Sequence, residues 1–334
     1  MATERVTRQG RGWYRGDCHV HSAASHGGEL APEQLAAAAR AAGLEFLAAT
    51  EHNTVDAQPA WSRCAGDGLV VIPGQEVVTR TGHWLALGLA PGQLVDWRYG
   101  VGDGLVDRQL EEVHRAGGLC VAAHPYAPYP TGTFGYPYQG FDVVEVWNGP
   151  WSSGVPWQAD NEAALAAWGR GLGEDLRQGR WRPAMGNSDT HLKGQMGTPH
   201  TVVSADGLRA DAILAGIRAG RSWIAASSAV ELSFTVSADR RSAGIGERLR
   251  TGDGPAVARV GVRGVPSGVV TLHTQQGEVH RAALSGTGSG TVEGHLGAEE
   301  SAFVRVEVRD AEGRMAALSN PVVLVGQPAP ERGR

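Results

Sequence analysis

Residues 16–21 read Gly-Asp-Cys-His-Val-His and predict a short β-strand that ends in two histidines. Alternate side chains of a strand point to the same face, so Asp17, His19 and His21 share one face while Cys18 and Val20 share the other. Two imidazoles separated by about 7 Å of strand rise can converge on one cation. The stretch therefore predicts a metal site at the end of the first strand.

Further polar clusters follow apolar runs along the chain, and each stands where a predicted strand ends. In a β/α barrel the carboxyl ends of the strands meet at one edge, which is where active sites form. Burying these groups without partners would cost free energy, so together they favour a shared metal site. The clusters are Thr50-Glu51-His52-Asn53, Gln75-Glu76, Gly82-His83, Ala123-His124-Pro125 and Asn187-Ser188-Asp189-Thr190-His191.

The first two-thirds of the chain alternate between strand-like and helix-like runs. Strands are predicted at 16–20, 45–50, 68–72, 84–89, 118–123 and 142–147. Helices are predicted at 32–43, 106–116, 161–176 and 210–219, the first with a proline near its start and a glycine at its end. Such alternation implies an α/β fold with a parallel sheet covered by helices, and a barrel is one way to close it.

The pattern changes near residue 226. Short alternating runs at 230–236, 257–262, 269–273 and 303–308 are separated by Gly, Ser, Pro and Asp, and helical patterns disappear. These features are typical of a small antiparallel β-sandwich. We therefore predict a metallohydrolase-type α/β domain at 1–225, an all-β domain at 226–326 and a disordered tail at 327–334.

An aromatic-rich segment spans residues 125–157. It holds nine of the 21 aromatic residues of the chain, interspersed with prolines and glycines. A long loop in a compact domain is often functional. A loop packed by its own aromatic side chains is the competing interpretation, and the two are compatible.

Composition narrows the classes of protein. The 334 residues are 42% hydrophobic, enough for a substantial core, and the net charge of −5 leaves no basic footprint for nucleic acid. No apolar run approaches the roughly 18–20 residues of a membrane span, and the first residues lack the apolar core of a signal peptide. Three widely spaced cysteines fit a reducing cytoplasm better than a disulfide framework. We expect a cytoplasmic protein without a membrane partner, and a homo-oligomer is left open.

The ordered motifs DxHxH, T(D/E)HN, GxE followed by GH, AHP and (S/N)SDxH resemble the PHP superfamily, named for polymerase and histidinol phosphatase. Within it the chain looks most like the CehA/McbA-type metallohydrolases, which also end in a small β-sandwich. The resemblance covers about residues 13–325. It implies a distorted (β/α)7 PHP-type barrel that holds two or three divalent metal ions, and nitrogen and oxygen ligands suit Zn, Mn or Fe.

The resemblance also implies a role for each matching residue. Glu76 would bridge two metals, and Glu51, which replaces the commoner Asp, would support ligands rather than bind metal. His26 is the nearest match to a further family histidine, although it stands one residue closer to the first pair. A second histidine for the middle metal is not evident, since His114 lies on a predicted solvated helix face. The implied ligand sets are His19, His21, Glu76 and Asp189 for one ion, Glu76 and His124 for the second, and His52 and His191 for a third.

The expected chemistry is hydrolysis. Paired ions lower the pKa of a bound water, and no Ser-His-Asp nucleophile motif is evident, so direct attack by a metal-bound hydroxide is expected. The candidate catalytic residues are Asp189, His191 and His26, and the two histidines could protonate a leaving group if they do not bind metal. The candidate substrate-binding residues are His83, Lys193, Arg80, Tyr126 and Trp147.

The leading hypothesis is a phosphoesterase that cleaves a small anionic phosphomonoester or phosphodiester. The same metal site could instead cleave a carboxyl ester or carbamate. An amidohydrolase-type barrel is a third interpretation, and a non-catalytic metal-binding module is a fourth.

Overall fold

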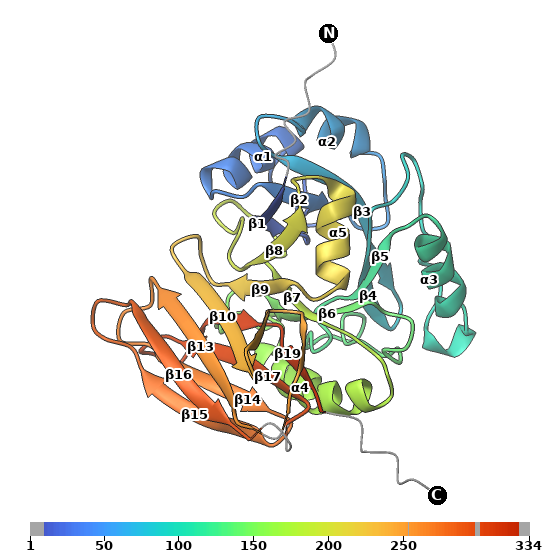
Figure 1. The fold of residues 1–334 in the computed structure, drawn as a ribbon. Coiled ribbons are helices and arrows are strands. Elements are labelled where there is room, and N and C mark those ends of the chain that lie inside the picture. The colour runs from blue at the N-terminus through green and yellow to red at the C-terminus, as the bar shows by residue number, and fades with distance from the viewer. Residues whose placement is uncertain (1–9, 253, 298–300, 327–334) are drawn as a thin grey trace, which may run out of the picture. The chain divides into compact units, whose positions relative to one another are not determined.

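The computed structural model describes residues 10–252, 254–297 and 301–326 (Figure 1). The chain divides into two compact units. One comprises Met1–Gly171 with Trp181–Ser228, and the other comprises Leu172–Arg180 with Ala229–Arg334. The predicted tail at 327–334 lies outside the described residues. The predicted α/β class is confirmed, because the first unit combines a large sheet with helices.

The sheet of the first unit has the order β9-β8-β1-β2-β3-β4-β5-β6-β7. Its strands β1–β2–β3 and β5–β6–β7 are parallel, whereas β4 is antiparallel to both neighbours and β8 to β1 and β9. The strands are β1 (Arg11–Asp17), β2 (Phe46–Ala49), β3 (Val70–Thr79), β4 (Gly82–Leu87), β5 (Leu119–Ala122), β6 (Val143–Asn148), β7 (Ala184–Asn187), β8 (His200–Asp206) and β9 (Ser222–Ala225).

The expectation of a purely parallel sheet was therefore wrong. Only Arg80 and Thr81 separate β3 from β4, and so short a connection can join only antiparallel strands, because a parallel pair needs a long crossover. The strands β8 and β9, which we did not predict, are joined to their neighbours in the same antiparallel manner.

The two ends of this sheet approach each other. The Thr201 hydroxyl of β8 accepts a hydrogen bond from the Gly186 N–H of β7 (3.1 Å) and donates one to the Gly186 carbonyl (2.8 Å). A Cβ atom on Gly186 would lie 2.4 Å from the Ile224 side chain of β9. Glycine is needed here because only a residue without a side chain lets β7 lie so close to β9.

The helices are α1 (Pro32–Ala41), α2 (Gln58–Cys64), α3 (Val106–Arg115), α4 (Asn161–Arg177) and α5 (Ala210–Arg218), with a 3₁₀ turn at Val101–Asp103. Helix α1 begins at Pro32, whose fixed φ suits the first helical position, and the chain leaves it through Gly43 at φ 75°. We did not predict α2, which has only seven residues and buries only Trp61 and Cys64.

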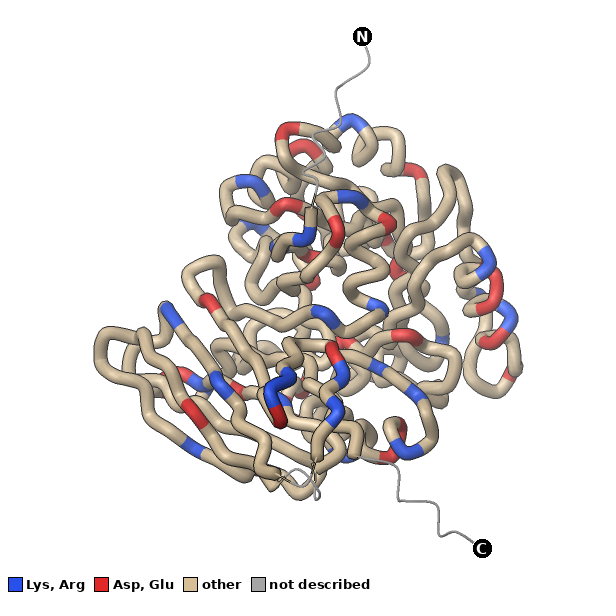
Figure 2. The backbone as a smooth tube through the Cα atoms, viewed as in Figure 1, with Lys and Arg blue, Asp and Glu red and all other residues tan. Residues whose placement is uncertain are grey.

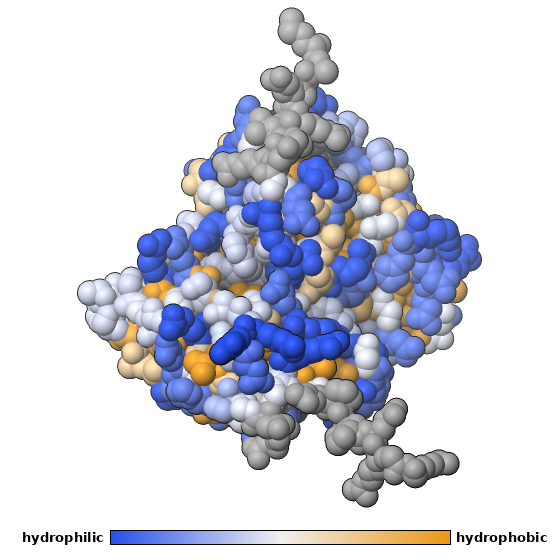
Figure 3. All heavy atoms as spheres, viewed as in Figure 1, coloured by the Kyte–Doolittle hydropathy of each residue, from blue (hydrophilic) through white to orange (hydrophobic). Residues whose placement is uncertain are grey.

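Helix α3 illustrates how the unit separates apolar and polar faces. It buries Val106, Leu110 and Val113 against the sheet side. Its outer surface is hydrophilic (Figure 3) and carries acidic and basic residues side by side (Figure 2). Within the described ranges, no helix combines the length and hydrophobicity that a membrane span needs.

The second unit contains two groups of strands. One is a four-stranded antiparallel sheet in the order β11-β10-β13-β16. In the other, β17 pairs with β14, β18 and β19, β14 with β15, and β19 with β12. The strands are β10 (Glu231–Ala238), β11 (Arg241–Gly244), β12 (Arg248–Arg250), β13 (Ala256–Arg263), β14 (Val269–Thr274), β15 (Gly277–Ala283), β16 (Gly290–Leu296), β17 (Phe303–Arg309), β18 (Met315–Ser319) and β19 (Val322–Val325).

Strand β10 shows why these sequences form half-buried strands. Its residues alternate strictly between exposed and buried, with Leu232, Phe234 and Val236 inside. The arrangement of the two sheets as a sandwich, and the predicted domain boundaries, stay predictions.

Candidate metal centre

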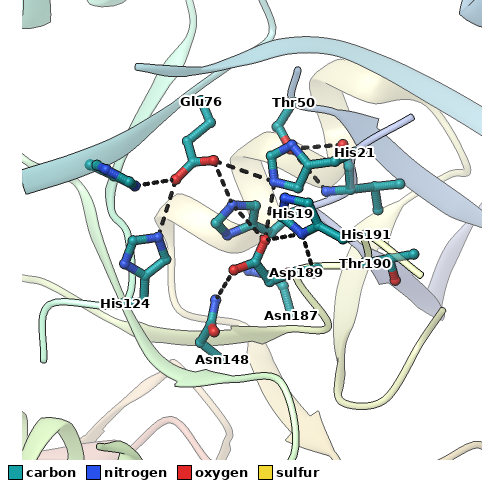
Figure 4. A network of polar contacts seen from close by, with 12 residues as sticks. His19, His21, Thr50, Glu76, His124, Asn148, Asn187, Asp189, Thr190 and His191 are labelled. Atoms are coloured by element: carbon teal, nitrogen blue, oxygen red, sulfur yellow. Dashed lines mark hydrogen bonds and ion pairs between the residues drawn. The ribbon is translucent and has the colours of Figure 1, made fainter. Parts of the chain in front are cut away.

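The strand ends of the first unit bring six histidines and two carboxylates together (Figure 4). Each comes from the carboxyl end of a strand, from the segment that follows it, or from the β3–β4 hairpin. In Figure 4, Glu76 lies between His124 on one side and His19, His21 and His191 on the other. The converging residues are His19 and His21 after β1, His52 after β2, Glu76 in β3, His83 in β4, His124 after β5, and Asp189 and His191 after β7. With His83 counted, the imidazole rings number six, and all but His83 were proposed as ligands from the sequence.

Glu76 is the centre of this cluster. Its Oε2 atom lies 2.9 Å from His52 Nε2 and 3.3 Å from Nε2 of both His19 and His21. Its Oε1 atom lies 2.9 Å from His83 Nδ1 and 3.1 Å from His124 Nε2. The two oxygens of one buried carboxylate therefore face two different sets of imidazoles.

Asp189 forms the other side of the cluster. Its Oδ1 atom lies 3.1 Å from His21 Nε2 and 3.4 Å from both His19 Nε2 and His191 Nδ1. Its backbone has a positive φ of 51°, and that of His124 has a φ of 24°, both uncommon for residues with side chains. Such backbone conformations concentrate at functional sites, where the surrounding structure holds them.

The charges of the cluster are strongly coupled. Burial by itself would raise the pKa of Glu76, but the charges of His19, His52 and His83 outweigh it and hold that pKa well below its usual range. Burial likewise opposes ionisation of Asp189, and His19 and His21 reverse the effect on its pKa. Both carboxylates are therefore anionic, the form that can bind a cation. Burial lowers the pKa of His21 to about 3, so its imidazole is neutral and has a lone pair to offer.

The unpaired atoms of the cluster fit divalent cations. Several fully buried nitrogen and oxygen atoms find no hydrogen-bond partner among the described residues, a costly arrangement unless a ligand completes it. The atoms of each of four overlapping triads of potential ligands lie within 4.8 Å of one another, and imidazole nitrogens and carboxylate oxygens without thiolates suit Zn, Mn or Fe(II). The unpaired atoms are His19 Nε2, His21 Nε2, His83 Nε2, His124 Nδ1 and Asp189 Oδ1.

Glu145, on β6, supports this cluster and was missed in the sequence. It is buried, and its carboxylate lies 3.0 Å from His19 Nδ1 and accepts the His124 N–H at 2.8 Å. The side-chain amides of Asn148 and Asn187 also donate to it. A single carboxylate within the otherwise apolar strand Val143–Trp147 was the available signal.

Glu51, which we expected to support ligands, lies outside the ligand triads of the described residues. It accepts hydrogen bonds from Trp61 Nε1 (2.7 Å), from the Ser22 N–H (3.1 Å) and from the Ser25 hydroxyl. The Ser25 oxygen in turn accepts the His52 N–H at 2.9 Å and lies 3.3 Å from His21 Nδ1. Through Ser25, Glu51 is thus linked to the His21 ring and to the backbone of His52.

His83 lies within the cluster of potential metal ligands, which we did not expect. We predicted it as a substrate-binding residue, and the structure places it against Glu76 and His124 in a buried triad. With His124, it gives Glu76 Oε1 two neighbouring imidazoles. His114 instead pairs with Asp142 at 2.8 Å, away from this cluster.

Other candidate residues are not brought to the cluster. Among the described residues, no hydrogen bond, ion pair or ring contact joins His26, Lys193, Arg80 or Tyr126 to it. Arg80 is exposed and pairs with Asp103, while His26 and Lys193 are exposed in their loops. Trp147 is buried, donates its indole N–H to the Gly149 carbonyl (2.9 Å) and packs on Trp151.

The aromatic segment is largely a packed loop. Tyr136 and Phe141 are buried in the core with Trp84, and the Tyr136 hydroxyl lies 2.7 Å from Thr79 Oγ1. Tyr129 differs, because its ring lies 6.0 Å from the His83 ring and 6.5 Å from the His124 ring, centre to centre. Burial raises the pKa of its hydroxyl, with further contributions from Glu76 and Asp189, so the phenol is protonated.

Comparison with known proteins finds similarity to PHP-type proteins. The family model described as PHP-associated matches residues 174–222, which include the cluster at 187–191. An uncharacterised protein of Methanocaldococcus jannaschii is 25% identical over 133 residues, which are 34% of this chain and 69% of that protein. A two-domain protein of Bacteroides vulgatus containing a predicted PHP-like metal-dependent phosphoesterase has a similar fold, with a TM-score of 0.51 and 17% identity over 93% of this chain and 96% of that one.

Proposed function

We propose that this chain is a divalent-metal-dependent phosphoesterase of the PHP superfamily and of its CehA/McbA type, acting on a small phosphomonoester or phosphodiester. One carboxylate carries the proposal: Glu76 lies within 3.3 Å of a nitrogen of each of five histidines. The finer fold is, on this proposal, a distorted (β/α)7 barrel followed by a β-sandwich. The similarity of fold to a protein that contains a PHP-like phosphoesterase supports it.

Three sites can be assigned to the ligands, and the first two overlap. Glu76 is shared by the first two, so the ions would lie close together. His83 completes the second site, which had only one histidine, His124, on sequence grounds alone. The ligand sets are His19, His21, Glu76 and Asp189 for the first ion, Glu76, His83 and His124 for the second, and His52 and His191 for a third.

When bound, Zn, Mn or Fe ions lower the pKa of water and stabilise negative charge on phosphoryl oxygens. The protein prepares the ligands for this role through hydrogen bonds to their second nitrogens. His19 Nδ1 lies against Glu145, so its proton is held there and the Nε2 lone pair faces the cluster. His191 Nδ1 lies 3.0 Å from the Asp189 carbonyl oxygen, which holds the His191 proton on Nδ1 and frees Nε2.

Carboxyl ester or carbamate hydrolysis is the alternative for the same residues. The aromatic loop had suggested an organic group beside the labile bond. Four aromatic residues of that loop, Tyr136, Phe141, Trp147 and Trp151, are buried and offer no surface for such a group. A phosphoryl group carries more negative charge than a carboxyl ester or carbamate. It therefore matches a cluster with enough ligands for several cations better than those groups do.

A hydrolysis panel tests the proposal. Purified protein with Mn, Zn, Fe(II) or chelator is assayed with nitrophenyl phosphate, bis-nitrophenyl phosphate and nitrophenyl acetate. We expect cleavage of a phosphate compound that chelation abolishes and that His19→Ala removes. The control is His295→Ala, which removes an exposed histidine of β16. Cleavage of the acetate alone would move the assignment to ester or carbamate hydrolysis, and metal-independent cleavage would overturn it.

A further inference from the structure

Tyr129 has the placement of a substrate-contacting group. Its half-buried ring lies against the rings of His83 and His124, the two histidines that share Glu76 Oε1. Two other tyrosines of this loop have different partners. The Tyr136 hydroxyl bonds Thr79, and the Tyr138 ring stacks between Phe134 and the Arg182 guanidinium.

The loop that carries Tyr129 is fixed by hydrogen bonds. The Thr133 hydroxyl donates to the Ala127 carbonyl at 2.7 Å, and the Phe134 N–H donates to the Pro125 carbonyl at 3.1 Å. The Gly135 N–H donates to the carbonyl of Thr81 (2.8 Å), in the turn that leads directly into His83. The position of Tyr129 relative to His83 is therefore set by backbone contacts at both ends of the loop.

Gly132 makes room for the Tyr129 ring. A Cβ atom at this position would lie 2.1 Å from Tyr129 Cε2 and 2.3 Å from its Cζ, distances that no real side chain tolerates. A residue other than glycine would push the ring away from its place. Glycine at position 132 thus allows the Tyr129 ring to lie beside the cluster.

We propose that Tyr129 contacts the substrate, with its hydroxyl donating a hydrogen bond to a phosphoryl oxygen at the Glu76, His83 and His124 end of the centre. This inference rests on the proposed phosphoesterase function and adds a specificity residue to it. The phenol is a neutral donor, so it binds an anionic oxygen without competing for the cations.

The test compares metal-loaded wild-type, Tyr129→Phe and Gly132→Ala proteins, with Tyr138→Phe as the control that removes a hydroxyl from the same loop. Calorimetry measures the Kd for inorganic phosphate, kinetics gives kcat and KM for nitrophenyl phosphate, and elemental analysis gives the metal content. We expect Tyr129→Phe to raise the Kd and KM about tenfold, the usual effect of losing a hydrogen bond to a charged group, at unchanged metal content. Gly132→Ala should weaken phosphate binding in the same direction, and Tyr138→Phe should not.

Phosphate affinity within twofold of wild type in Tyr129→Phe would overturn the inference, as would a loss that merely follows lost metal. Wild-type protein that binds no phosphate would also overturn it. Wild-type protein that cleaves no phosphate ester, yet binds phosphate through Tyr129, would support the contact while refuting the proposed phosphoesterase function.

Discussion

His19 Nδ1 lies 3.0 Å from Glu145 Oε1, and both side chains are fully buried. His19 is thereby held in one tautomer, with Nε2 directed at Glu76 and Asp189. Glu145 also accepts the backbone N–H of His124, so a single carboxylate of β6 positions ligands that follow β1 and β5. Carboxylates in this position increase the basicity of a ligand histidine as well as orienting it.

Glu145→Gln should weaken metal binding by about 10- to 100-fold, because a neutral amide orients His19 but polarises it less. Competition against a chelator of known affinity measures the change. Glu111→Gln, on the exposed face of α3, is the matched control. Metal affinity within twofold of wild type in Glu145→Gln would mean that this carboxylate has only a structural role.

The substitutions His83→Ala and His26→Ala should affect the metal content differently. His83 lies 2.9 Å from Glu76 and is buried, whereas His26 is exposed and outside the cluster triads of the described residues. We expect His83→Ala to lose an ion under conditions in which His26→Ala retains the wild-type content, as measured by elemental analysis. The reverse result would restore His26 as the further ligand that the family resemblance suggested.

Much of the site could be predicted from the sequence, because the end of a strand is recognisable as an apolar run followed by a polar cluster. The sequence pattern did not give the orientation of individual side chains or the direction of each strand relative to its neighbours. Nothing in the spacing of Arg80 or Trp147 tells which way each side chain points, and the structure pairs Arg80 with Asp103 and the Trp147 indole with the Gly149 carbonyl. Likewise, apolar periodicity does not distinguish a parallel strand from the antiparallel β4. Glu145 was missed because a buried carboxylate is recognised only by its partners, which come from distant parts of the chain.

Folding stability should depend on His200 at mildly acidic pH. Burial lowers its pKa from 6.5 to about 4, and Arg15 Nη1 lies 2.9 Å from its Nε2. As the pH falls below 6.5, the unfolded chain therefore binds a proton that the folded chain excludes, and stability is lost until about pH 4. The loss amounts to about 3 kcal/mol, the free energy that corresponds to this shift in pKa.

Denaturant unfolding of wild type and His200→Asn between pH 7 and pH 4 measures this contribution. The stability advantage of wild type over the variant should shrink as the pH falls. Both proteins keep the same candidate metal ligands, so metal lost at low pH cancels in the comparison. A difference that stays constant over this range would contradict the assignment of a neutral, buried His200.

Gly186→Ala should destabilise the first unit by about 1–3 kcal/mol, the usual cost of overpacking a core. The added Cβ would lie 2.4 Å from Ile224 and 3.1 Å from the Trp147 Cβ, where β7 meets β9. Thermal unfolding measures the effect, with Gly154→Ala as the control because its Cβ would meet nothing within 4 Å. Equal melting temperatures for the two variants would show that the ends of the sheet are not so closely packed.

The most direct test of whether Glu76 is shared by two metal sites is elemental analysis. Wild-type and Glu76→Gln protein are each loaded with Mn or Zn and freed of unbound metal, and the ions that remain are counted. We predict two or three ions per chain in the wild type and a loss of more than one ion in the variant, because both oxygens of Glu76 face imidazoles. A wild-type content below one ion per chain, or an unchanged count in Glu76→Gln, would contradict the account.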